Sequence, residues 1–345
     1  MGPARVLRAL AALALVGACA SAPGNAWTEA SLPGPGSRLL RDAVACGEHW
    51  YVVGGRAGGG GETSPAAWDS TDGRTWRSLT LHPLPGSYYG PRSVLYAVAC
   101  ARDRIAAVGS VGGGAHGNPR VSTWYQRPDN SLAEAAAPFE TYGGDTAVDV
   151  GRIAGGPSGF LLAGNRTSGA AAWLSPDGTS FRLFENAPGL AGAFARDGAV
   201  LEGRFVLVGG LGDAPAAWSS PDGTSWQRVG MPVEGGYAEA QRVVRSGPEL
   251  IAVGRRGDTL AAWRGPDWTA IARFGKADAT GVRSLAVSHG RLYAAGSGLW
   301  RSDNGGRSWL TVTTPRGADP LAAVAVRDDR VLLVAGDRAW LARGV

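Results

Sequence analysis

Four aspartates recur in one short motif, and carboxylates repeated in this way could act as acid–base pairs or as calcium ligands. They are Asp72, Asp177, Asp222 and Asp303; glycine follows the first three directly, Asn-Gly follows Asp303, and a tryptophan or phenylalanine closes each motif. An Asp-Gly or Asn-Gly pair also closes a β-hairpin, because the Asp or Asn side chain bonds its own backbone and glycine accepts a positive φ. Turn geometry alone explains the motif, so we expect these aspartates to be structural and not catalytic.

Metal and cofactor chemistry is not indicated by the remaining residues. The four histidines lie singly in separate stretches without the spacing of metal ligands: His49, His82, His116 and His289. No nucleophile-elbow, Walker or dinucleotide-binding motif follows a suitable strand. We therefore expect no metal, no cofactor and no catalytic residue that the pattern alone can name.

Tyrosine, arginine and glutamate gather in several loops, and this mixture can hold sugars or peptide termini through ring stacking and bidentate hydrogen bonds. We expect a ligand-binding face made by Tyr88, Tyr89, Arg92, Glu140, Tyr142, Arg166, Tyr237, Glu239 and Arg255. The alternative is that these residues belong to solvated loops that do not converge.

Seven short apolar strands each end in glycine, and this second pattern organises the whole chain. The closing glycines are Gly54, Gly109, Gly164, Gly209, Gly254, Gly296 and Gly336. A tryptophan follows each glycine and marks a third strand: Trp68, Trp124, Trp173, Trp218, Trp263, Trp300 and Trp340. Another apolar run precedes each glycine strand, so each unit holds four strands in about 40 to 55 residues, the size of a β-propeller blade.

The chain ends soon after Trp340, so the seventh unit lacks an outer strand of its own. The stretch Ala26–Leu32 is similar to the fourth strand of other units, and we expect it to complete the seventh sheet and close the ring. The predicted fold is all-β, a seven-bladed β-propeller of four-stranded antiparallel blades over residues 27–345. Six or eight blades are the alternatives.

The repeated turn resembles the Asp-box, or BNR repeat, of the sialidase-like β-propellers, whose pattern is Ser-x-Asp-x-Gly-x-Thr-Trp. The resemblance implies that the four aspartates are structural turn residues on the rim, remote from any catalytic centre. A sialidase of this family would also need three arginines, a tyrosine nucleophile with a glutamate partner, and an aspartate acid/base. Its Phe/Tyr-Arg-Ile-Pro motif does not occur in the sequence.

Intact scaffold motifs beside absent catalytic ones favour a non-catalytic binding or assembly platform for a protein or glycan partner. Other Asp-box propellers, such as photosystem assembly factors and sortilin-type receptors, are used in this way. The alternative is a divergent sialidase-like glycoside hydrolase or lyase that uses Arg92, Tyr89, Glu140 or their neighbours.

The first eighteen residues have the pattern of an export signal and lie outside the expected fold. Arg5 and Arg8 form a positive region before the apolar run Ala9–Ala18, which is too short to span a bilayer as a helix. Residues 1–18 are therefore predicted to be a signal peptide.

The end of this segment, Leu15–Cys19, resembles the lipobox of bacterial lipoproteins. The resemblance implies that Cys19 carries lipid and becomes the mature N-terminus, with residues 19–26 as a short tether. The protein would then lie on the outer side of the cytoplasmic membrane, in the cell envelope, and contact the membrane only through this lipid. An ordinary secretory signal cleaved near residues 20–22 is the alternative.

The two remaining cysteines, Cys46 and Cys100, stand in parallel Val-Ala-Cys contexts of adjacent units. An exported protein with one such pair can form a disulfide between them. The alternative is two buried thiols, because inner strands of neighbouring blades can be too far apart to bridge.

The charge of the chain does not indicate a polyanionic partner. The formal net charge of +5 falls by two, to +3, when Arg5 and Arg8 leave with the signal. Arginine outnumbers lysine 33 to one, which is typical of coding bias in GC-rich DNA. No nucleic-acid-binding motif occurs, so we expect a monomer that binds an envelope protein or glycan and no nucleic acid.

Overall fold

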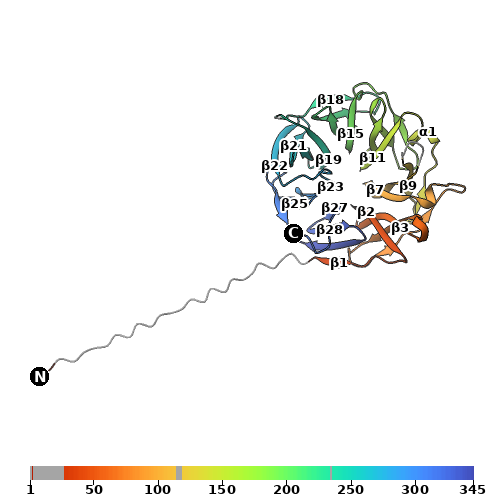
Figure 1. Ribbon diagram of the computed structural model, residues 1–345, viewed down its shortest axis with the longest axis horizontal. Helices are drawn as coiled ribbons and strands as arrows, with labels where there is room; N and C mark the ends of the chain where they lie inside the picture. The colour runs from red at the N-terminus through yellow and green to blue at the C-terminus, as the bar shows by residue number, and fades with distance from the viewer. Residues whose placement is uncertain (1, 3–26, 114–118, 234) are drawn as a thin grey trace.

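Seven β-sheets stand around a central axis in the computed structural model, which describes residues 2, 27–113, 119–233 and 235–345 (Figure 1). The predicted signal peptide, the tether and Cys19 lie outside the described residues. Each sheet is a blade whose first strand lines the axis and whose last strand lies at the perimeter. The predicted seven-bladed, four-stranded antiparallel propeller is confirmed.

The first three blades follow the chain in order. Blade 1 contains β2 (Ser37–Cys46), β3 (His49–Ala57), β4 (Thr63–Ser70) and β5 (Arg77–Ser78). Blade 2 contains β7 (Val94–Ala101), β8 (Arg104–Val111), β9 (Arg120–Gln126), β10 (Leu132–Glu134) and an added outer strand, β6 (Leu81–His82). Blade 3 contains β11 (Ala147–Gly156), β12 (Gly159–Arg166), β13 (Gly169–Ser175) and β14 (Arg182–Phe184).

The remaining blades repeat this order. Blade 4 contains β15 (Ala193–Leu201), β16 (Arg204–Leu211), β17 (Ala214–Ser220) and β18 (Gln227–Gly230). Blade 5 contains β19 (Ala238–Ser246), β20 (Glu249–Arg256), β21 (Thr259–Gly265) and β22 (Thr269–Phe274). Blade 6 contains β23 (Ser284–Ser288), β24 (Arg291–Ala295), β25 (Leu299–Ser302) and β26 (Leu310–Val312). Blade 7 contains β27 (Leu321–Arg327), β28 (Arg330–Ala335), β29 (Arg338–Arg343) and β1 (Thr28–Ala30).

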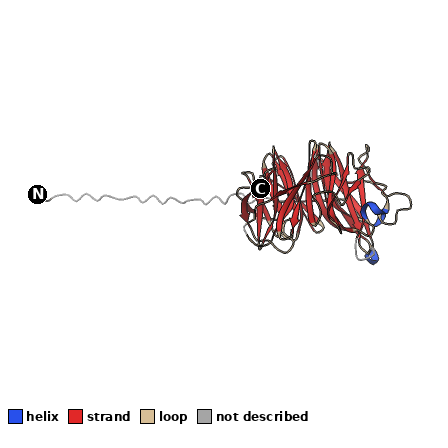
Figure 2. Cartoon of the chain, turned by 90° about the horizontal axis from the view of Figure 1, so that it is seen from above, coloured by secondary structure: helices blue, strands red, loops and turns tan. Residues whose placement is uncertain are grey.

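The two ends of the chain meet in blade 7. Strand β1 pairs antiparallel with β29, with Thr28 opposite Leu341 and Ala30 opposite Ala339, and Figure 1 shows β1 beside β28 and the C-terminus. This pairing confirms the predicted closure of the ring, which leaves no sheet interface open. Figure 2 shows the sheets edge-on, with the few helical residues gathered at one side of the ring.

A close backbone approach explains the recurring glycine of the second strand. In six blades the innermost strand carries a register shift, as between Leu40 and Asp42 in blade 1 and between Ala195 and Asp197 in blade 4. A Cβ on Gly54 would lie 2.1 Å from the carbonyl oxygen of Leu39, and one on Gly209 would lie 1.8 Å from that of Phe194. Only glycine fits opposite the bulges of blades 1, 3, 4 and 5, whereas Gly336 of blade 7 meets no atom within 4 Å.

The third-strand tryptophans form the core between blades. They are Trp68, Trp124, Trp173, Trp218, Trp263, Trp300 and Trp340, and all are at most 7% exposed. Trp173 packs in a cluster that also contains Ala97 and Val108 of blade 2, so the tryptophan of one blade covers its neighbour. A buried tryptophan removes a large apolar area from water, and these seven hold adjacent sheets together.

Three of the repeated aspartates occupy the hairpin turns assigned to them. The Asp72 carboxylate accepts hydrogen bonds from the backbone N–H groups of Arg74 (2.8 Å) and Thr75 (2.7 Å). Asp177 and Asp222 accept the same type of bond from the N–H groups two residues on. These amides lower the pKa of Asp72 to about 2, and those of Asp177 and Asp222 in the same direction. The carboxylates are ionised at neutral pH and already bonded, so they are unsuited to be general acids.

The prediction for the fourth aspartate is wrong. In blade 6 the turn acceptor is Asn304, which accepts hydrogen bonds from Ser302 Oγ (3.1 Å) and from the backbone N–H of Ser308 (2.9 Å). Asp303 instead forms ion pairs with Arg291 (2.6 Å) and Arg301 (2.9 Å). Asp303 directly follows Ser302 and so stands where Thr71 stands after Ser70, whereas Asn304, two residues after the serine, takes the place of Asp72.

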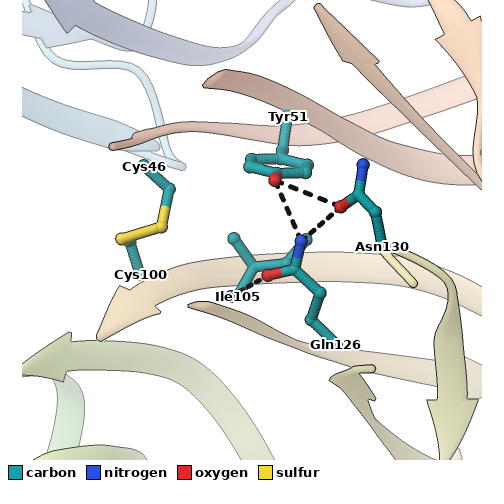
Figure 3. The surroundings of a disulfide bond; sticks show 6 residues. All are labelled: Cys46, Tyr51, Cys100, Ile105, Gln126 and Asn130. Atoms are coloured by element: carbon teal, nitrogen blue, oxygen red, sulfur yellow. Dashed lines mark hydrogen bonds between the residues drawn. A yellow bond between two sulfur atoms is a disulfide. The ribbon is translucent and has the colours of Figure 1, made fainter. Parts of the chain in front are cut away.

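A disulfide joins Cys46 at the end of β2 to Cys100 in β7, the innermost strands of blades 1 and 2, with Cα atoms 5.4 Å apart (Figure 3). Beside it, Gln126 Nε2 donates to Tyr51 Oη (2.9 Å), and Gln126 Oε1 accepts the Ile105 N–H (2.9 Å). The bridge and this polar contact tie the same two blades to each other.

Reduction of the disulfide should lower stability. The bridge closes a 54-residue segment, and the loss of its constraint on the unfolded chain corresponds to about 4 kcal/mol. We expect a lower melting temperature in reductant for the wild type and no effect of reductant on Cys46→Ser/Cys100→Ser. A wild-type melting temperature that reductant leaves unchanged, despite complete reduction, would contradict this expectation.

The turn in blade 6 should depend on Asn304 and not on Asp303. Asn304→Ala removes the acceptor of the turn and should cost about 1 kcal/mol, by analogy with helix caps. Asp303→Ala removes half-exposed ion pairs, which contribute less. Denaturant unfolding of the two variants measures the difference, and an equal or larger loss in Asp303→Ala would restore the original assignment.

Candidate functional site

The central channel holds charges that neutralise one another. The Asp42 carboxylate in blade 1 forms an ion pair with Arg152 in blade 3 (3.1 Å) and accepts the Val98 N–H (3.0 Å). Asp197 in blade 4 accepts the Val243 N–H (3.1 Å). Each carboxylate thus bonds the innermost strand of the next blade. The contacts make these aspartates structural links between blades.

The arginines of the channel complete this network. Burial raises the pKa of the Asp197 carboxyl, although the positive charges of Arg242 and Arg152 act in the opposite direction. Arg242 Nε donates to the Arg283 carbonyl (2.7 Å), and burial lowers the pKa of Arg242 to about 10, so it stays charged at neutral pH. A hollow of about 370 Å³ between the innermost strands is lined by these groups and by alanine and valine. Its charged groups all have structural partners.

The predicted ligand face divides into two groups. Tyr88, Tyr89 and Tyr142 line one cleft between blades 2 and 3, whereas Tyr237, Glu239 and Arg255 lie in blade 5 and do not line it. The expected convergence of all nine residues on one site is therefore wrong. Loops of different blades point their side chains to separate parts of the ring.

The first wall of the cleft is the long loop between blades 1 and 2, residues 79–93. Its strand β6 runs parallel to β10 and covers the outer edge of blade 2. The buried Glu134 carboxylate accepts the Leu84 N–H (2.9 Å) and the Ser87 hydroxyl (2.8 Å). Gly90 lies against this carboxylate, where a Cβ would be 1.9 Å from Glu134 Oε2. Glu134 thereby fixes the loop that presents Tyr88 and Tyr89.

The second wall is the connection between blades 2 and 3, which contains the single turn α1 (Phe139–Tyr142). Arg166 of β12 is 3% exposed and donates to the carbonyl oxygens of Glu140 (2.8 Å), Thr141 (3.0 Å) and Gly143 (2.6 Å). The prediction that Arg166 binds ligand is therefore wrong, because its guanidinium is committed to holding this wall. The exposed side chain of Glu140 lies outside the lining of the cleft.

Tyr142 is also committed to the wall. Its hydroxyl shares a 3.1 Å hydrogen bond with Thr123 Oγ1, and burial raises the pKa of the phenol. The Trp173 Nε1 donates to the Thr141 carbonyl oxygen (2.5 Å) and fixes the same turn from below. Tyr142 contributes apolar surface to the cleft, but a phenol with a raised pKa is a poor nucleophile.

The cleft between these walls has a volume of about 830 Å³. Its floor is the start of β9, from Arg120 to Ser122, and Leu84, Pro85, Val121 and Pro138 contribute apolar surface. Three large side chains at this place are exposed: Tyr88 by 63%, Tyr89 by 38% and Phe139 by 55%. Clustered exposed aromatic surface beside a concave site is typical of a surface that binds a partner.

Two arginines and three aromatic side chains contact one another in and beside the cleft. Arg92 lies over the Tyr88 ring at 4.3 Å, and the rings of Tyr88 and Tyr89 meet edge to face at 5.2 Å. Arg120 lies over both Tyr89 (5.9 Å) and Phe139 (4.8 Å). We call these five residues the arginine–aromatic ladder. Cation–π contacts hold the rings in place while their outer faces remain in water.

The second group lies where blades 4 and 5 meet. The Glu239 carboxylate accepts hydrogen bonds from Arg196 Nε (2.9 Å) and Gln241 Nε2 (2.6 Å). Tyr237 is 40% exposed, and burial and Glu239 raise the pKa of its phenol. Arg255 lies 5.9 Å from the Tyr237 ring and donates to the Gly257 carbonyl. The group holds a tyrosine–glutamate pair, but its charges are paired and the tyrosine is not activated.

Arg120, Phe139 and Glu134 belong to the cleft and were missed by sequence reasoning. Arg120 and Glu134 belong to short strands, where their neighbours indicate scaffold and not function. Phe139 directly precedes Glu140 in the loop already singled out, so its large apolar side chain in a polar segment was an available signal.

Among the described residues, no cluster of three or more His, Cys, Asp or Glu could hold a metal ion. Within the same residues, no helix has the length and hydrophobicity needed to cross a bilayer.

Comparison with known proteins gives structural neighbours only. No family model and no curated protein sequence matches the chain. Solved propellers match over nearly their whole length: YCF48 bound to D1 peptide (15% identity, TM-score 0.59, 94% of this chain and 99% of that one) and virginiamycin B lyase from Staphylococcus aureus (9% identity, TM-score 0.65, 93% and 99%). The WD40 propeller domain of Doa1 is similar too (11% identity, TM-score 0.60, 92% and 97%). At these identities the likeness shows the propeller fold alone.

Proposed function

We propose that this propeller is a non-catalytic binding or assembly platform in the cell envelope, and that its partner, an envelope protein or a glycan, binds in the cleft between blades 2 and 3. The lipid on Cys19 would hold the ring at the outer side of the cytoplasmic membrane. The observation that carries the proposal is the cleft itself, with three exposed aromatic rings held on two buttressed walls.

The construction of the walls supports binding by a preformed surface. Glu134 fixes one wall and Arg166 the other, each through several hydrogen bonds to backbone or side-chain groups. Rings that are already ordered lose little conformational entropy when a partner covers them. Aromatic side chains are enriched in the cores of protein interfaces, and tyrosine is among the residue types that contribute most to the binding energy.

The state of the titratable groups argues against catalysis. The aspartates of the turns and of the channel are bonded to backbone amides or arginine, and the Tyr142 and Tyr237 phenols have raised pKa values. A turn aspartate that acted as a general acid would need a raised pKa, and a tyrosine nucleophile would need a lowered one.

The structural neighbours are compatible with a binding role without requiring it. YCF48 is seen with a bound peptide, which supports a protein partner for this chain, whereas virginiamycin B lyase is an enzyme on the same fold. Function on a shared fold is decided by the site and not by the fold. The cleft side chains therefore carry the proposal.

A sialidase-like hydrolase is the second candidate, and one observation favours it. Tyr237 and Glu239 are adjacent and Arg196 bonds the glutamate, which is the type of pair that a tyrosine nucleophile needs. The raised pKa of Tyr237 opposes this function. Turnover of a fluorogenic sialoside that is abolished by Tyr237→Phe would establish the second candidate in place of the first.

Removal of the exposed rings should abolish partner binding without loss of fold. Tyr89→Ser/Phe139→Ser should reduce capture of the specific envelope partner at least about tenfold, because two rings of the cleft centre are lost. Affinity capture from solubilised envelope with quantitative mass spectrometry measures the change.

Leu310→Ser is the matched control, since Leu310 is 58% exposed in β26 of blade 6, away from the cleft. It should leave capture unchanged. Equal capture by wild type and the double variant, or loss in the control alone, would show that the partner binds elsewhere.

The predicted anchor has a separate test. Cys19→Ala removes the only thiol that the lipobox could modify, so the protein should leave the membrane fraction and appear in soluble form. Fractionation of cells that express each form measures the shift. Continued membrane association of Cys19→Ala at the wild-type level would contradict lipid anchoring but leave the cleft proposal intact.

A further inference from the structure

Arg92 and Arg120, the two arginines of the arginine–aromatic ladder, have no carboxylate partner among the described residues. Arg120 forms no ion pair there, and its buried Nε lacks a hydrogen-bond acceptor. Arg92 donates to the Tyr88 carbonyl (2.9 Å) and likewise forms no ion pair within that part of the chain. By contrast, Arg152 and Arg196 each bond a carboxylate.

The acidic side chains that line the cleft do not neutralise this charge. Both oxygens of Glu134 are occupied by the Leu84 N–H and the Ser87 hydroxyl, and the residue is 7% exposed. Asp145 is exposed at the edge of the cleft, where water screens its charge. The partly buried Arg120 guanidinium between two rings is therefore the cation most able to bind an anion here.

The polar atoms of the cleft are poorly placed to recognise sugar hydroxyls. Ser87 Oγ donates to Glu134 and accepts the Gly90 N–H, and Ser122 Oγ accepts Trp124 Nε1–H (3.0 Å). Most of the remaining lining is proline, alanine, valine, leucine and aromatic ring. A glycan site needs many free donors and acceptors, whereas an apolar site with one cation matches a peptide.

We propose, on the basis of the binding function proposed above, that the cleft accepts an extended protein segment in which a carboxylate lies beside an aromatic or large aliphatic side chain. The carboxylate pairs with the Arg120 guanidinium in the ladder. The apolar side chain packs on the exposed faces of Tyr89 and Phe139. A charge-assisted hydrogen bond in this partly desolvated place is stronger than one at an open surface.

The test uses a phage-displayed library of random dodecapeptides, selected on the mature full-length protein in detergent. Enriched peptides should carry Asp or Glu within two positions of Phe, Tyr, Trp or Leu. A synthetic peptide of the enriched type should bind in fluorescence anisotropy, and its affinity should fall at least about tenfold when its acid is replaced by the corresponding amide. That replacement changes no residue of the protein, so it cannot be confused with misfolding.

A matched pair of protein variants locates the carboxylate. Arg120→Gln should weaken the same peptide at least about tenfold, whereas Arg182→Gln should change its affinity less than twofold. Arg182 makes a similar contact with Phe184 (4.9 Å) on β14 but does not line the cleft. Equal melting temperatures of the variants verify their folding.

Each outcome decides between the two proposals. Enriched peptides that lack Asp and Glu would overturn the acidic-segment inference. So would an amide peptide that binds as tightly as the acidic one, or an Arg120→Gln variant that binds the acidic peptide as tightly as the wild type does. If such peptides still lost binding in Tyr89→Ser/Phe139→Ser, the cleft would remain the binding site. No enrichment of any peptide would overturn the inference and also remove the protein-binding form of the proposed function.

Discussion

The packing of one buried tryptophan from each blade against the next blade is the interaction on which the ring depends. Trp68, Trp124, Trp173, Trp218 and Trp263 are at most 1% exposed, and apolar burial of this size is the largest favourable contribution in a fold of short strands. In blades 1, 3, 4 and 5 the glycine beside the bulge lets the first two strands approach closely beneath the tryptophan. Stability then resides in the sheets, and the loops between blades are free to differ.

The connections before and after blade 2 differ most from those of the other blades. One loop adds a strand to the blade and rests on Glu134, and the other is held by Arg166, so an inter-blade seam becomes a cleft with rigid walls. The distribution of charge follows the same division. In the channel, Arg152 bonds the Asp42 carboxylate and Arg242 bonds a backbone carbonyl, whereas Arg92 and Arg120 lie over rings and form no ion pair within the described part of the chain.

The glycine and tryptophan patterns of the blades depend on residues close together in the sequence. For that reason they predicted the strands and the propeller fold well. Gly54 and Trp68 mark strands through their own steric needs, and the β1 strand is recognisable by its likeness to other fourth strands. Asp303 was assigned wrongly because an aspartate and an asparagine stand side by side in this turn, and only the second lies two residues after the serine. The sequence alone does not distinguish Arg166 from Arg120. In the structure, Arg166 is buried against three carbonyl oxygens, whereas Arg120 lies between two aromatic rings. Such differences arise from contacts distant in sequence, which no local pattern contains.

The central claim is that the partner binds over the aromatic surface between blades 2 and 3. Site-specific photocrosslinking in living cells tests it most directly, with p-benzoylphenylalanine in place of Tyr89 or, as the comparison, in place of Leu310. The account predicts a discrete crosslinked protein from position 89 that disappears in the Arg120→Gln background, and none from position 310. The same adduct from position 310, or no adduct from position 89, would contradict it.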